Sequence, residues 1–357
     1  MGISTAPVDE TKLNDFLGQM VGDLGAAANA PLMVIGDKLG LYKALAAAGP
    51  LSSAALAAQT GTAERFVREW LAAQAASGYV TYDADTDTYA MSPEQTTVLA
   101  DEDSPVFLAG LFESLYAMMV AEPKIREAFQ TGKGVGWHEH HPCLFSGTER
   151  FFRTGYRANL VQHWLPALDG VVEKLAHGAT VADVGCGHGA STIIMAQAFP
   201  KSQFVGFDYH DASIARATEA AREAGVAETV RFEVAAGQDY PGTDYDLVAT
   251  FDCLHDMGDP VGAARHVLES LAPDGTWLIV EPFANDALAD NLNPVGKLYY
   301  AASTMLCTPA SLSQEVGLGL GAQAGEARLR QVIEDGGFTR FRRAAATPFN
   351  LILEARP

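Results

Sequence analysis

A glycine-rich segment directly after an apolar stretch is the part of the sequence whose residue types best suit ligand binding. Residues 181–191 read VADVGCGHGAS, and Gly185, Gly187 and Gly189 permit a tight turn that lets the backbone approach a ligand closely. The apolar residues before the turn predict a buried strand, and those after it predict a helix whose free N–H groups can bind a carboxylate or phosphate. Asp208 ends a second apolar stretch. It lies about 25 residues after Asp183 of the first stretch, the spacing expected for an acid that binds a ribose.

The spacing of these glycines differs from that of a dinucleotide-binding loop. The dinucleotide pattern is G-x-G-x-x-G, whereas here the third glycine comes one residue earlier, as G-C-G-H-G. Asp183, two positions before the first glycine, would repel a pyrophosphate and attract a cation. The run D-V-G-C-G-H-G resembles motif I of the class I S-adenosylmethionine-dependent methyltransferases. The resemblance implies that residues 185–189 lie along the methionine part of the cofactor and that Asp208 accepts hydrogen bonds from both ribose hydroxyls.

A second candidate motif lies in residues 246–260, DLVATFDCLHDMGDP. A buried strand is expected to end near Thr250, and Pro260 begins the next helix at a position that proline tolerates. An imidazole with an ordinary pKa of about 6.5 can accept the proton of a hydroxyl that is to become a nucleophile. In a sheet of order 3-2-1-4-5 the fourth strand adjoins the first, so His255 is expected to emerge beside the glycine loop, where such sheets bind ligands.

The form L-H-D-M-x-D resembles the H-D-W motif of the O-methyltransferases, with Met257 in place of the tryptophan. The resemblance implies that His255 is the catalytic base and that Glu281, at the end of the fifth strand, orients it. Asp256 is a second candidate partner of the base, although an acid before a helix is often only a cap. The resemblance covers nearly the whole chain and implies S-adenosyl-L-methionine as cofactor, with S-adenosyl-L-homocysteine as its product.

The expected contacts to the adenine depart from the family pattern. Many class I enzymes have an acid that holds the adenine amino group, and the matching position here is Ala236. The backbone of Ala236 and Gly237, or the side chain of Gln238, would have to serve instead. The complete set of expected cofactor contacts is Asp183, Gly185, Cys186, Gly187, Gly189, Asp208, Tyr209, Ala236, Gly237, Gln238 and Asp252.

Residues 137–143, WHEHHPC, combine three histidines with a cysteine. Zinc and other soft metals prefer these ligand types, but the helical i, i+4 spacing and the paired clusters of zinc modules are both missing. We therefore favour a polar loop that lines the acceptor pocket over a metal site, and no metal is predicted. The residues expected to line this pocket are Trp137, His138, His141, Tyr299 and Tyr300. As part of a helical stripe, the two tyrosines are equally expected in the core.

Size and composition describe an ordinary globular chain. Its 357 residues fit two domains, and hydrophobic and charged contents of 48% and 19% leave ample material for a core. A net charge of −20 argues against nucleic acid as a partner, because phosphate binding requires a basic surface. The sequence has no long apolar run, no signal-peptide pattern and no C-x-x-C pair among its four cysteines, so a cytoplasmic protein without membrane contact is expected.

Residues 1–103 are expected to form an α-helical, winged-helix-like domain. The predicted elements are helices over 31–45, 52–61 and 62–77 and a β-hairpin over 79–91. The third helix carries Phe66, Trp70 and Leu71 on one face, its basic residues are offset by acidic ones, and the hairpin tip holds three aspartates, so DNA binding is not expected. The unit resembles the N-terminal dimerisation domain of small-molecule O-methyltransferases of the plant caffeate type and their actinobacterial relatives, which implies a homodimer.

The remaining chain is expected to hold a helical connector and substrate-pocket segment, 104–178, and the cofactor-binding domain, 179–357. Strands are predicted near 179–184, 203–207, 229–234, 244–250 and 275–281, and helices near 189–199, 211–224 and 259–272. This alternation predicts a Rossmann-like, doubly wound α/β fold with a mostly parallel sheet of seven strands, the last two from an antiparallel pair at the C-terminus. Residues 285–324 show little regular pattern apart from a helix candidate over 295–306, and we expect a lid-like insertion.

The expected activity is methyl transfer from S-adenosylmethionine to a small-molecule acceptor, at a hydroxyl with His255 as base. A sulfur or nitrogen acceptor is an alternative in which His255 only orients the acceptor, since a thiol or amine needs less help from a base. A non-enzymatic alternative is a cofactor-sensing regulator, in which a winged helix is joined to a ligand-binding domain. The acidic hairpin argues against this alternative. The fold is also compatible with other chemistry on the same cofactor, such as decarboxylation.

Overall fold

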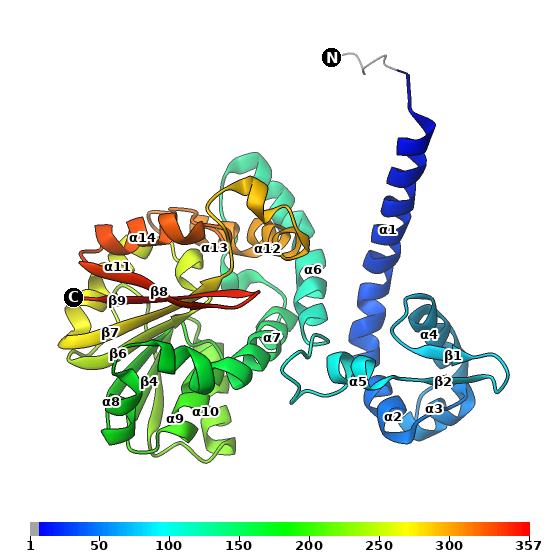
Figure 1. The fold of residues 1–357 in the computed structure, drawn as a ribbon, viewed down its shortest axis with the longest axis horizontal. Helices are drawn as coiled ribbons and strands as arrows, with labels where there is room; N and C mark the ends of the chain where they lie inside the picture. The colour runs from blue at the N-terminus through cyan, green and yellow to red at the C-terminus, as the bar shows by residue number, and fades with distance from the viewer. Residues whose placement is uncertain (1–6) are drawn as a thin grey trace. The chain divides into compact units, whose positions relative to one another are not determined.

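The protein consists of two compact units, Met1–Tyr116 and Ala117–Pro357, each with a hydrophobic core of its own (Figure 1). The structure is a computed structural model that describes residues 7–357. Within this range, no helix combines the length and the apolar character needed to cross a membrane.

The smaller unit consists of helices followed by one β-hairpin. Its elements are α1 (Glu10–Lys38), α2 (Leu41–Ala48), α3 (Ser53–Thr60), α4 (Glu64–Ala76), β1 (Thr81–Asp83), β2 (Thr88–Ala90) and α5 (Pro93–Leu99). Ser52 caps α3 by accepting a hydrogen bond from the Ala55 N–H, and Gly61 ends the helix, as the sequence predicts. The antiparallel pairing of β1 with β2 completes the winged-helix order of elements.

The single helix predicted over 31–45 is wrong. The structure has two helices there, because the chain turns at Gly40, whose φ of 68° lies in the left-handed region that favours glycine. The first of them, α1, already begins at Glu10 after the cap residue Asp9. Pro31 therefore lies inside a long helix rather than at its start.

The prediction for the inward face of α4 is wrong at one residue. Trp70 and Leu71 are buried, but Phe66 is 79% exposed and Val67 points into the core instead. Val67 lies three and four positions before Trp70 and Leu71, which places all three side chains on one helical face, whereas Phe66 falls beside that face. The indole N–H of Trp70 donates to the carbonyl of Leu32 at 2.9 Å, so α4 is held against α1.

The larger unit is an α/β domain built on one sheet of seven strands. Its main elements are α7 (Cys143–Asn159), α8 (Val171–His177), β3 (Thr180–Val184), α9 (Ala190–Ala198), β4 (Gln203–Asp208), α10 (Asp211–Glu223), β5 (Val230–Val234), β6 (Tyr245–Phe251), α11 (Pro260–Ser270), β7 (Leu271–Pro282), α12 (Pro294–Ala302), α13 (Thr308–Leu312), α14 (Gly325–Asp335), β8 (Arg340–Ala346) and β9 (Asn350–Arg356). One further helix, α6 (Leu111–Thr131), spans the division between the two units.

The strand order is β5-β4-β3-β6-β7-β9-β8, which confirms the doubly wound fold. The first five strands are parallel, and the last two add an antiparallel pair beside β7. Because parallel strands end at the same edge of the sheet, the residues after β3, β4, β6 and β7 are brought together there. This edge carries the glycine loop and the candidate catalytic residues His255, Asp256 and Glu281.

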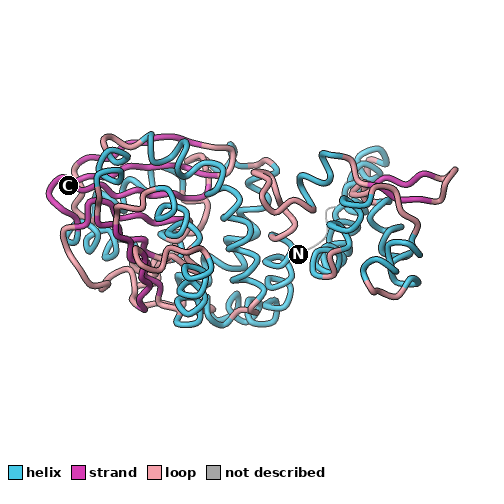
Figure 2. The backbone as a smooth tube through the Cα atoms, turned by 90° about the horizontal axis from the view of Figure 1, so that it is seen from below, coloured by secondary structure: helices cyan, strands magenta, loops and turns pink. Residues whose placement is uncertain are grey.

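Helices cover both faces of the sheet (Figures 1 and 2). Alternate residues of a strand point to opposite faces, and β3 follows this rule, with Val181 in one core and Ala182 in the other. The first core includes residues of α7, α8, α9 and α10, and the second includes residues of α11 and α14. The sheet is therefore buried on both sides and forms a rigid support for the loops at its edge.

Residues 285–324 contain more regular structure than the sequence suggests. The helix candidate over 295–306 corresponds to α12, followed directly by a π-helical turn at Ser303–Cys307 and by α13. The wider turn of the π-helix changes the direction in which the following side chains point. Cys307, the last residue of this turn, lies at the site described below.

Candidate active site

The glycine loop joins β3 to α9 in the conformation that its sequence predicts. Gly185, Gly187 and Gly189 have φ values of 77°, 53° and 80°, all in the left-handed region. A Cβ on Gly189 would lie 2.5 Å from the Phe232 ring, whereas one on Gly187 would meet nothing within 4 Å. Gly189 is therefore needed for packing, and Gly187 leaves open space in which a ligand can approach the backbone.

Asp208 ends β4 and holds the glycine loop in place. Its Oδ2 accepts a hydrogen bond from the Gly187 N–H at 2.9 Å, and its Oδ1 accepts one from the His210 N–H at 2.9 Å. Burial raises the pKa of the Asp208 carboxyl, although these hydrogen bonds favour its charged form. Each carboxylate oxygen has two lone pairs, so a ligand hydroxyl can be bound in addition.

Asp183 lies inside the sheet, directly before the loop, and its two oxygens differ. Oδ2 accepts hydrogen bonds from the hydroxyls of Ser191 and Thr192, both at 2.6 Å, whereas Oδ1 is buried without a hydrogen-bond partner in the described structure. Burial raises the pKa of Asp183 to about 6. A buried carboxylate with an unpaired oxygen is stabilised by a nearby cation. The residues around the loop thus fit a ligand that combines a positive charge with a ribose.

His255 and Glu281 meet at the ends of β6 and β7, as expected. Nδ1 of His255 is in hydrogen-bond contact with Oε2 of Glu281, and Glu281 Oε1 accepts from the Leu254 N–H at 3.0 Å. Both side chains are almost completely buried, at 3% and 1% exposed. A carboxylate is only an acceptor, so Nδ1 carries the hydrogen and the lone pair of neutral His255 lies on Nε2.

Asp256 approaches the other nitrogen of the same ring. Its Oδ1 lies 3.1 Å from His255 Nε2. Burial by itself would lower the pKa of His255, but the charges of Glu281 and Asp256 outweigh it and raise this pKa well above its ordinary value. The imidazole is therefore a stronger base than a free histidine and is protonated more readily.

Asp252, predicted as a cofactor contact, is held by protein partners. Its Oδ2 accepts from the Tyr156 hydroxyl at 3.2 Å and its Oδ1 from the Asn350 side-chain amide at 2.9 Å. Burial and then the charge of Glu281 raise its pKa well above the ordinary value. Asp252 has a φ of 51°, so its backbone is strained at the point where β6 leads into the site. Sequence reasoning missed Tyr156 and Asn350, because no local pattern marks them.

The loop after β5 lies next to the loop after β6, as an adenine site requires. Ala236, Gly237 and Gln238 are all half-buried. A Cβ on Gly237 would lie 3.1 Å from the sulfur of Met257, so this thioether packs against the loop at the position where the family motif has tryptophan. The Ala236 N–H donates to Asp239 Oδ1 at 3.2 Å and is already paired.

The histidine-rich segment lies beside the end of β4. The ring of His138 is 6.4 Å from that of Tyr209, edge to face. The side chain of His141 contacts its own segment, since its Nδ1 accepts a hydrogen bond from the Cys143 N–H at 3.2 Å. The segment therefore packs against the residue that follows Asp208. Cys186, also predicted at this place, is buried within the loop.

The two tyrosines expected in the acceptor pocket, Tyr299 and Tyr300, differ in burial. Tyr299 is 5% exposed and donates its hydroxyl hydrogen to the carbonyl of Phe349 at 3.0 Å. Burial raises the pKa of Tyr299, and the nearby charge of Asp252 raises it further. The ring of Tyr299 therefore lies near Asp252 and His255. Tyr300 is half-buried on the same helix, α12.

Two family models match the chain. Residues 175–337 match a methyltransferase domain, and residues 27–101 match an Rv2258c-like winged HTH domain. Among curated relatives, a trans-aconitate 2-methyltransferase of Acidovorax sp. (strain JS42) is 29% identical over 147 residues, which are 41% of this chain and 50% of the relative. The chain thus spans about half or less of the length of the curated relatives that it matches.

Solved structures of similar fold extend along nearly the whole chain. Mitomycin 7-O-methyltransferase MmcR is 19% identical with a TM-score of 0.68, covering 97% of this chain and 100% of its own. Human N-acetylserotonin methyltransferase, solved in complex with SAM, is 17% identical with a TM-score of 0.68, covering 99% of both chains. These likenesses concern the fold. Together with the two domain matches, they show that the chain combines a winged HTH domain with a methyltransferase domain and has the fold of these solved methyltransferases.

Proposed function

We propose that the protein transfers a methyl group from S-adenosylmethionine to a hydroxyl of a small-molecule acceptor, with His255 as the general base. The observation that supports this most is the His255–Glu281 pair at the carboxyl edge of the sheet, beside the glycine loop. O-Methylation also appears in the name of the similar mitomycin 7-O-methyltransferase. The acceptor itself is proposed only as a class, a small molecule with an ionisable hydroxyl.

In this proposal the cofactor-binding residues act through charge and backbone geometry. Asp208 accepts hydrogen bonds from the ribose hydroxyls, the unpaired oxygen of Asp183 faces the positive methionine part, and Gly187 permits close backbone approach. Met257 and Gly237 border the adenine. The bound cofactor supplies the methyl group on a cationic sulfur, which needs only a nucleophile in line with it.

The proton of the acceptor moves to Nε2 of His255. Glu281 holds the ring through Nδ1 and stabilises the imidazolium that forms, and Asp256 adds a second negative charge beside Nε2. Before a donor binds, the same carboxylates raise the pKa of His255. A cationic donor placed beside these carboxylates would lower this pKa again and release the base.

The pH profile of kcat/KM tests this mechanism. A general base must be unprotonated, so activity falls as the pH drops through the pKa of His255, and the raised pKa places this decline above the ordinary histidine range. Glu281→Gln removes a negative charge and thus lowers the pKa of His255, so we expect the decline to move to lower pH while the plateau falls at least about tenfold. The measurement is S-adenosylhomocysteine formation with a panel of hydroxyl, thiol and amine acceptors between acidic and alkaline pH.

The exposed Glu269 supplies the matched control, Glu269→Gln, which should leave the pH profile unchanged. A pH profile that is equally unchanged in Glu281→Gln would contradict the proposal.

A cofactor-sensing DNA-binding regulator is less well supported. The basic residues of α4 are already engaged within the helix, Arg65 with Glu69 at 2.6 Å and Arg68 with Glu64 at 2.9 Å. These pairs neutralise the charge that would otherwise meet phosphate groups.

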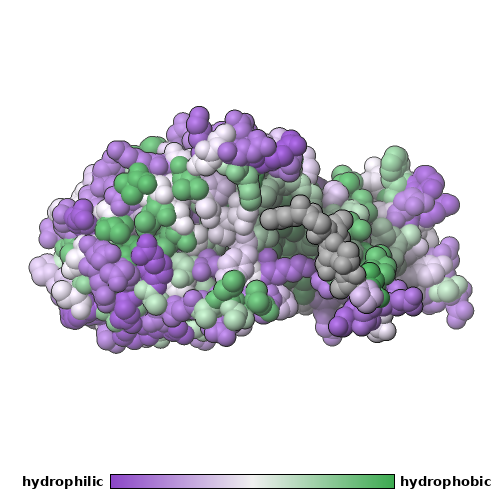
Figure 3. All heavy atoms as spheres, turned by 90° about the horizontal axis from the view of Figure 1, so that it is seen from above, coloured by the Kyte–Doolittle hydropathy of each residue, from purple (hydrophilic) through white to green (hydrophobic). Residues whose placement is uncertain are grey.

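We also propose a homodimer formed through α1. A cytoplasmic location is proposed as well, supported by the absence of a disulfide among the four cysteines, all of which lie in the described range. Figure 3 shows hydrophobic patches between hydrophilic residues on the face in view. On α1, large apolar side chains are exposed along one stripe; they are Leu13, Phe16, Leu17, Met20, Val21 and Leu24. Such a stripe on a helix is typical of a surface that pairs with another chain.

We expect analytical ultracentrifugation to show a dimer that Leu17→Glu combined with Leu24→Glu converts to a monomer, because charges in an apolar interface are costly. Gly22→Glu adds a charge on the other side of the same helix, where a Cβ meets nothing within 4 Å, and should leave the dimer intact. Dimers that survive the double substitution would show that α1 does not form the interface.

A further inference from the structure

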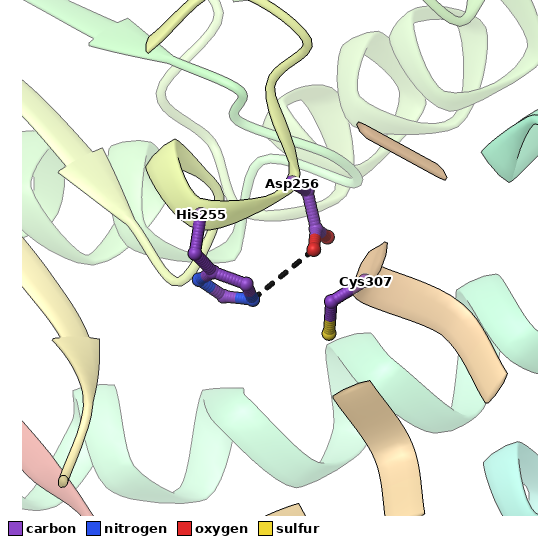
Figure 4. A group of neighbouring side chains, drawn as sticks. All are labelled: His255, Asp256 and Cys307. Atoms are coloured by element: carbon purple, nitrogen blue, oxygen red, sulfur yellow. Dashed lines mark ion pairs between the residues drawn. The ribbon is translucent and has the colours of Figure 1, made fainter. Parts of the chain in front are cut away.

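Three side chains that could bind a metal converge at the candidate base. His255, Asp256 and Cys307 each offer one donor atom, and these atoms all lie within 4.8 Å of one another. Figure 4 shows the three side chains directed toward a common space, with Cys307 coming from the helical segment after α12. Imidazole, carboxylate and thiolate are the ligand types of zinc and related divalent metals.

The donor geometry is close to that of a tetrahedral metal site. Bond lengths of about 2.0 to 2.3 Å place the donors of a tetrahedral zinc site roughly 3.5 Å apart. The His255 Nε2 to Asp256 Oδ1 distance is already 3.1 Å. The 4.8 Å limit leaves the Cys307 thiol at most about 1.3 Å farther from the other two donors than such a site requires. A rotation of one side chain suffices for such a shift.

The surroundings of His255 match those of a metal-binding histidine. Histidines that bind a metal through one ring nitrogen usually donate the other N–H to a carboxylate, which fixes the tautomer and the ring orientation. Glu281 has this relation to Nδ1, so Nε2 is directed toward Asp256 and Cys307 with its lone pair. Asp256 and Glu281 also make the local charge negative, which favours a cation.

A second buried histidine, in the histidine-rich segment, lacks hydrogen-bond partners within the described chain. His140 is 6% exposed, and neither of its ring nitrogens has a hydrogen-bond partner among the described residues. Burial and then the charge of Lys124 lower the pKa of His140, and the carboxylates of Glu139 and Asp256 act on it in the opposite direction. A buried imidazole without partners is costly, and a bound metal or metal-bound water would satisfy it.

We propose that His255 Nε2, Asp256 and Cys307 form a binding site for one zinc-class divalent cation, with the fourth coordination position open. Binding replaces the proton of the Cys307 thiol, which is released to solvent, and occupies the lone pair of His255 Nε2. The same lone pair accepts the acceptor's proton in the proposed function, on which this consequence rests. The bound cation therefore inhibits methyl transfer.

Cobalt(II) titration of the purified full-length protein, without donor or acceptor, tests the site independently of methyl transfer. A cobalt–thiolate bond gives a charge-transfer absorption band, which we expect in the native protein and not in Cys307→Ser. Cys143→Ser is the matched control, because Cys143 is also buried but belongs to the histidine-rich segment. Asp256→Asn should keep the band and weaken cobalt binding at least about tenfold, and Glu281→Gln should weaken it by roughly 10- to 100-fold.

The absence of a band in the native protein, or its loss in Cys143→Ser and not in Cys307→Ser, would overturn the proposal. Circular dichroism checks the fold of each variant, and the Asp256→Asn affinity decides the matter if Cys307→Ser does not fold. With an acceptor in hand, zinc should reduce S-adenosylhomocysteine formation by the native protein and much less so by Cys307→Ser, each relative to its own metal-free rate. A protein that binds cobalt through Cys307 but methylates no acceptor would refute the proposed function and leave the metal site standing.

Discussion

Asp208→Ala is expected to weaken the binding of S-adenosylmethionine at least about 100-fold. In the proposed function the carboxylate accepts hydrogen bonds from both ribose hydroxyls, and hydrogen bonds to a charged group contribute about 1.5 to 3 kcal/mol each. The substitution also leaves the N–H groups of Gly187 and His210 without their acceptor, so the glycine loop loses its anchor. Isothermal titration calorimetry with S-adenosylmethionine and S-adenosylhomocysteine measures both affinities.

The control for this substitution is Asp211→Ala. Asp211 is an exposed acid in the first turn of α10, close to Asp208 in sequence, and we expect its removal to change the affinity less than about threefold. Asp208→Asn is no neutral replacement, because both oxygens accept backbone hydrogen bonds and an amide offers only one oxygen. Equal affinities of the native protein and Asp208→Ala would remove the ribose contact from the proposal.

His255→Ala is expected to lower kcat at least about 100-fold while the affinity for S-adenosylmethionine stays within a few-fold, since general bases contribute typically 10² to 10⁴. The acceptor hydroxyl then has no group to take its proton. The measurement combines the rate of S-adenosylhomocysteine formation at saturating donor with calorimetry of donor binding. A thiol or amine acceptor needs less help from a base, so a small effect of this substitution would favour such an acceptor.

A second variant separates catalysis from stability. His255→Ala leaves the buried carboxylate of Glu281 without its partner on the ring, and breaking a buried pair in this way is strongly destabilising. His255→Gln can still donate a hydrogen bond to Glu281 but has no basic nitrogen. We expect it to unfold at a temperature closer to that of the native protein and to be as inactive as His255→Ala. Activity retained by His255→Gln would show that the histidine only orients the acceptor.

The sequence by itself determined the parts of the site that depend on local conformation. Gly185, Gly187 and Gly189 have left-handed backbone conformations that the turn requires, and the flanking apolar patterns predicted the strand and helix on either side. The alternation of strands and helices predicted the parallel sheet. Its strand order then brought His255 and Glu281 together, as the motif resemblance implied.

Tertiary structure alone decided which distant side chains surround these residues. Tyr156 and Asn350 bind Asp252 although they lie 96 and 98 positions away along the chain. Cys307, in the π-helical turn after α12, lies beside His255 and Asp256 although it is about 50 positions away along the chain. Periodicity reports which face of an element is buried, but it does not report which other element covers that face. The partners of Asp252 and the position of Cys307 therefore depend on packing, whereas the conformation of the glycine loop depends on local backbone chemistry.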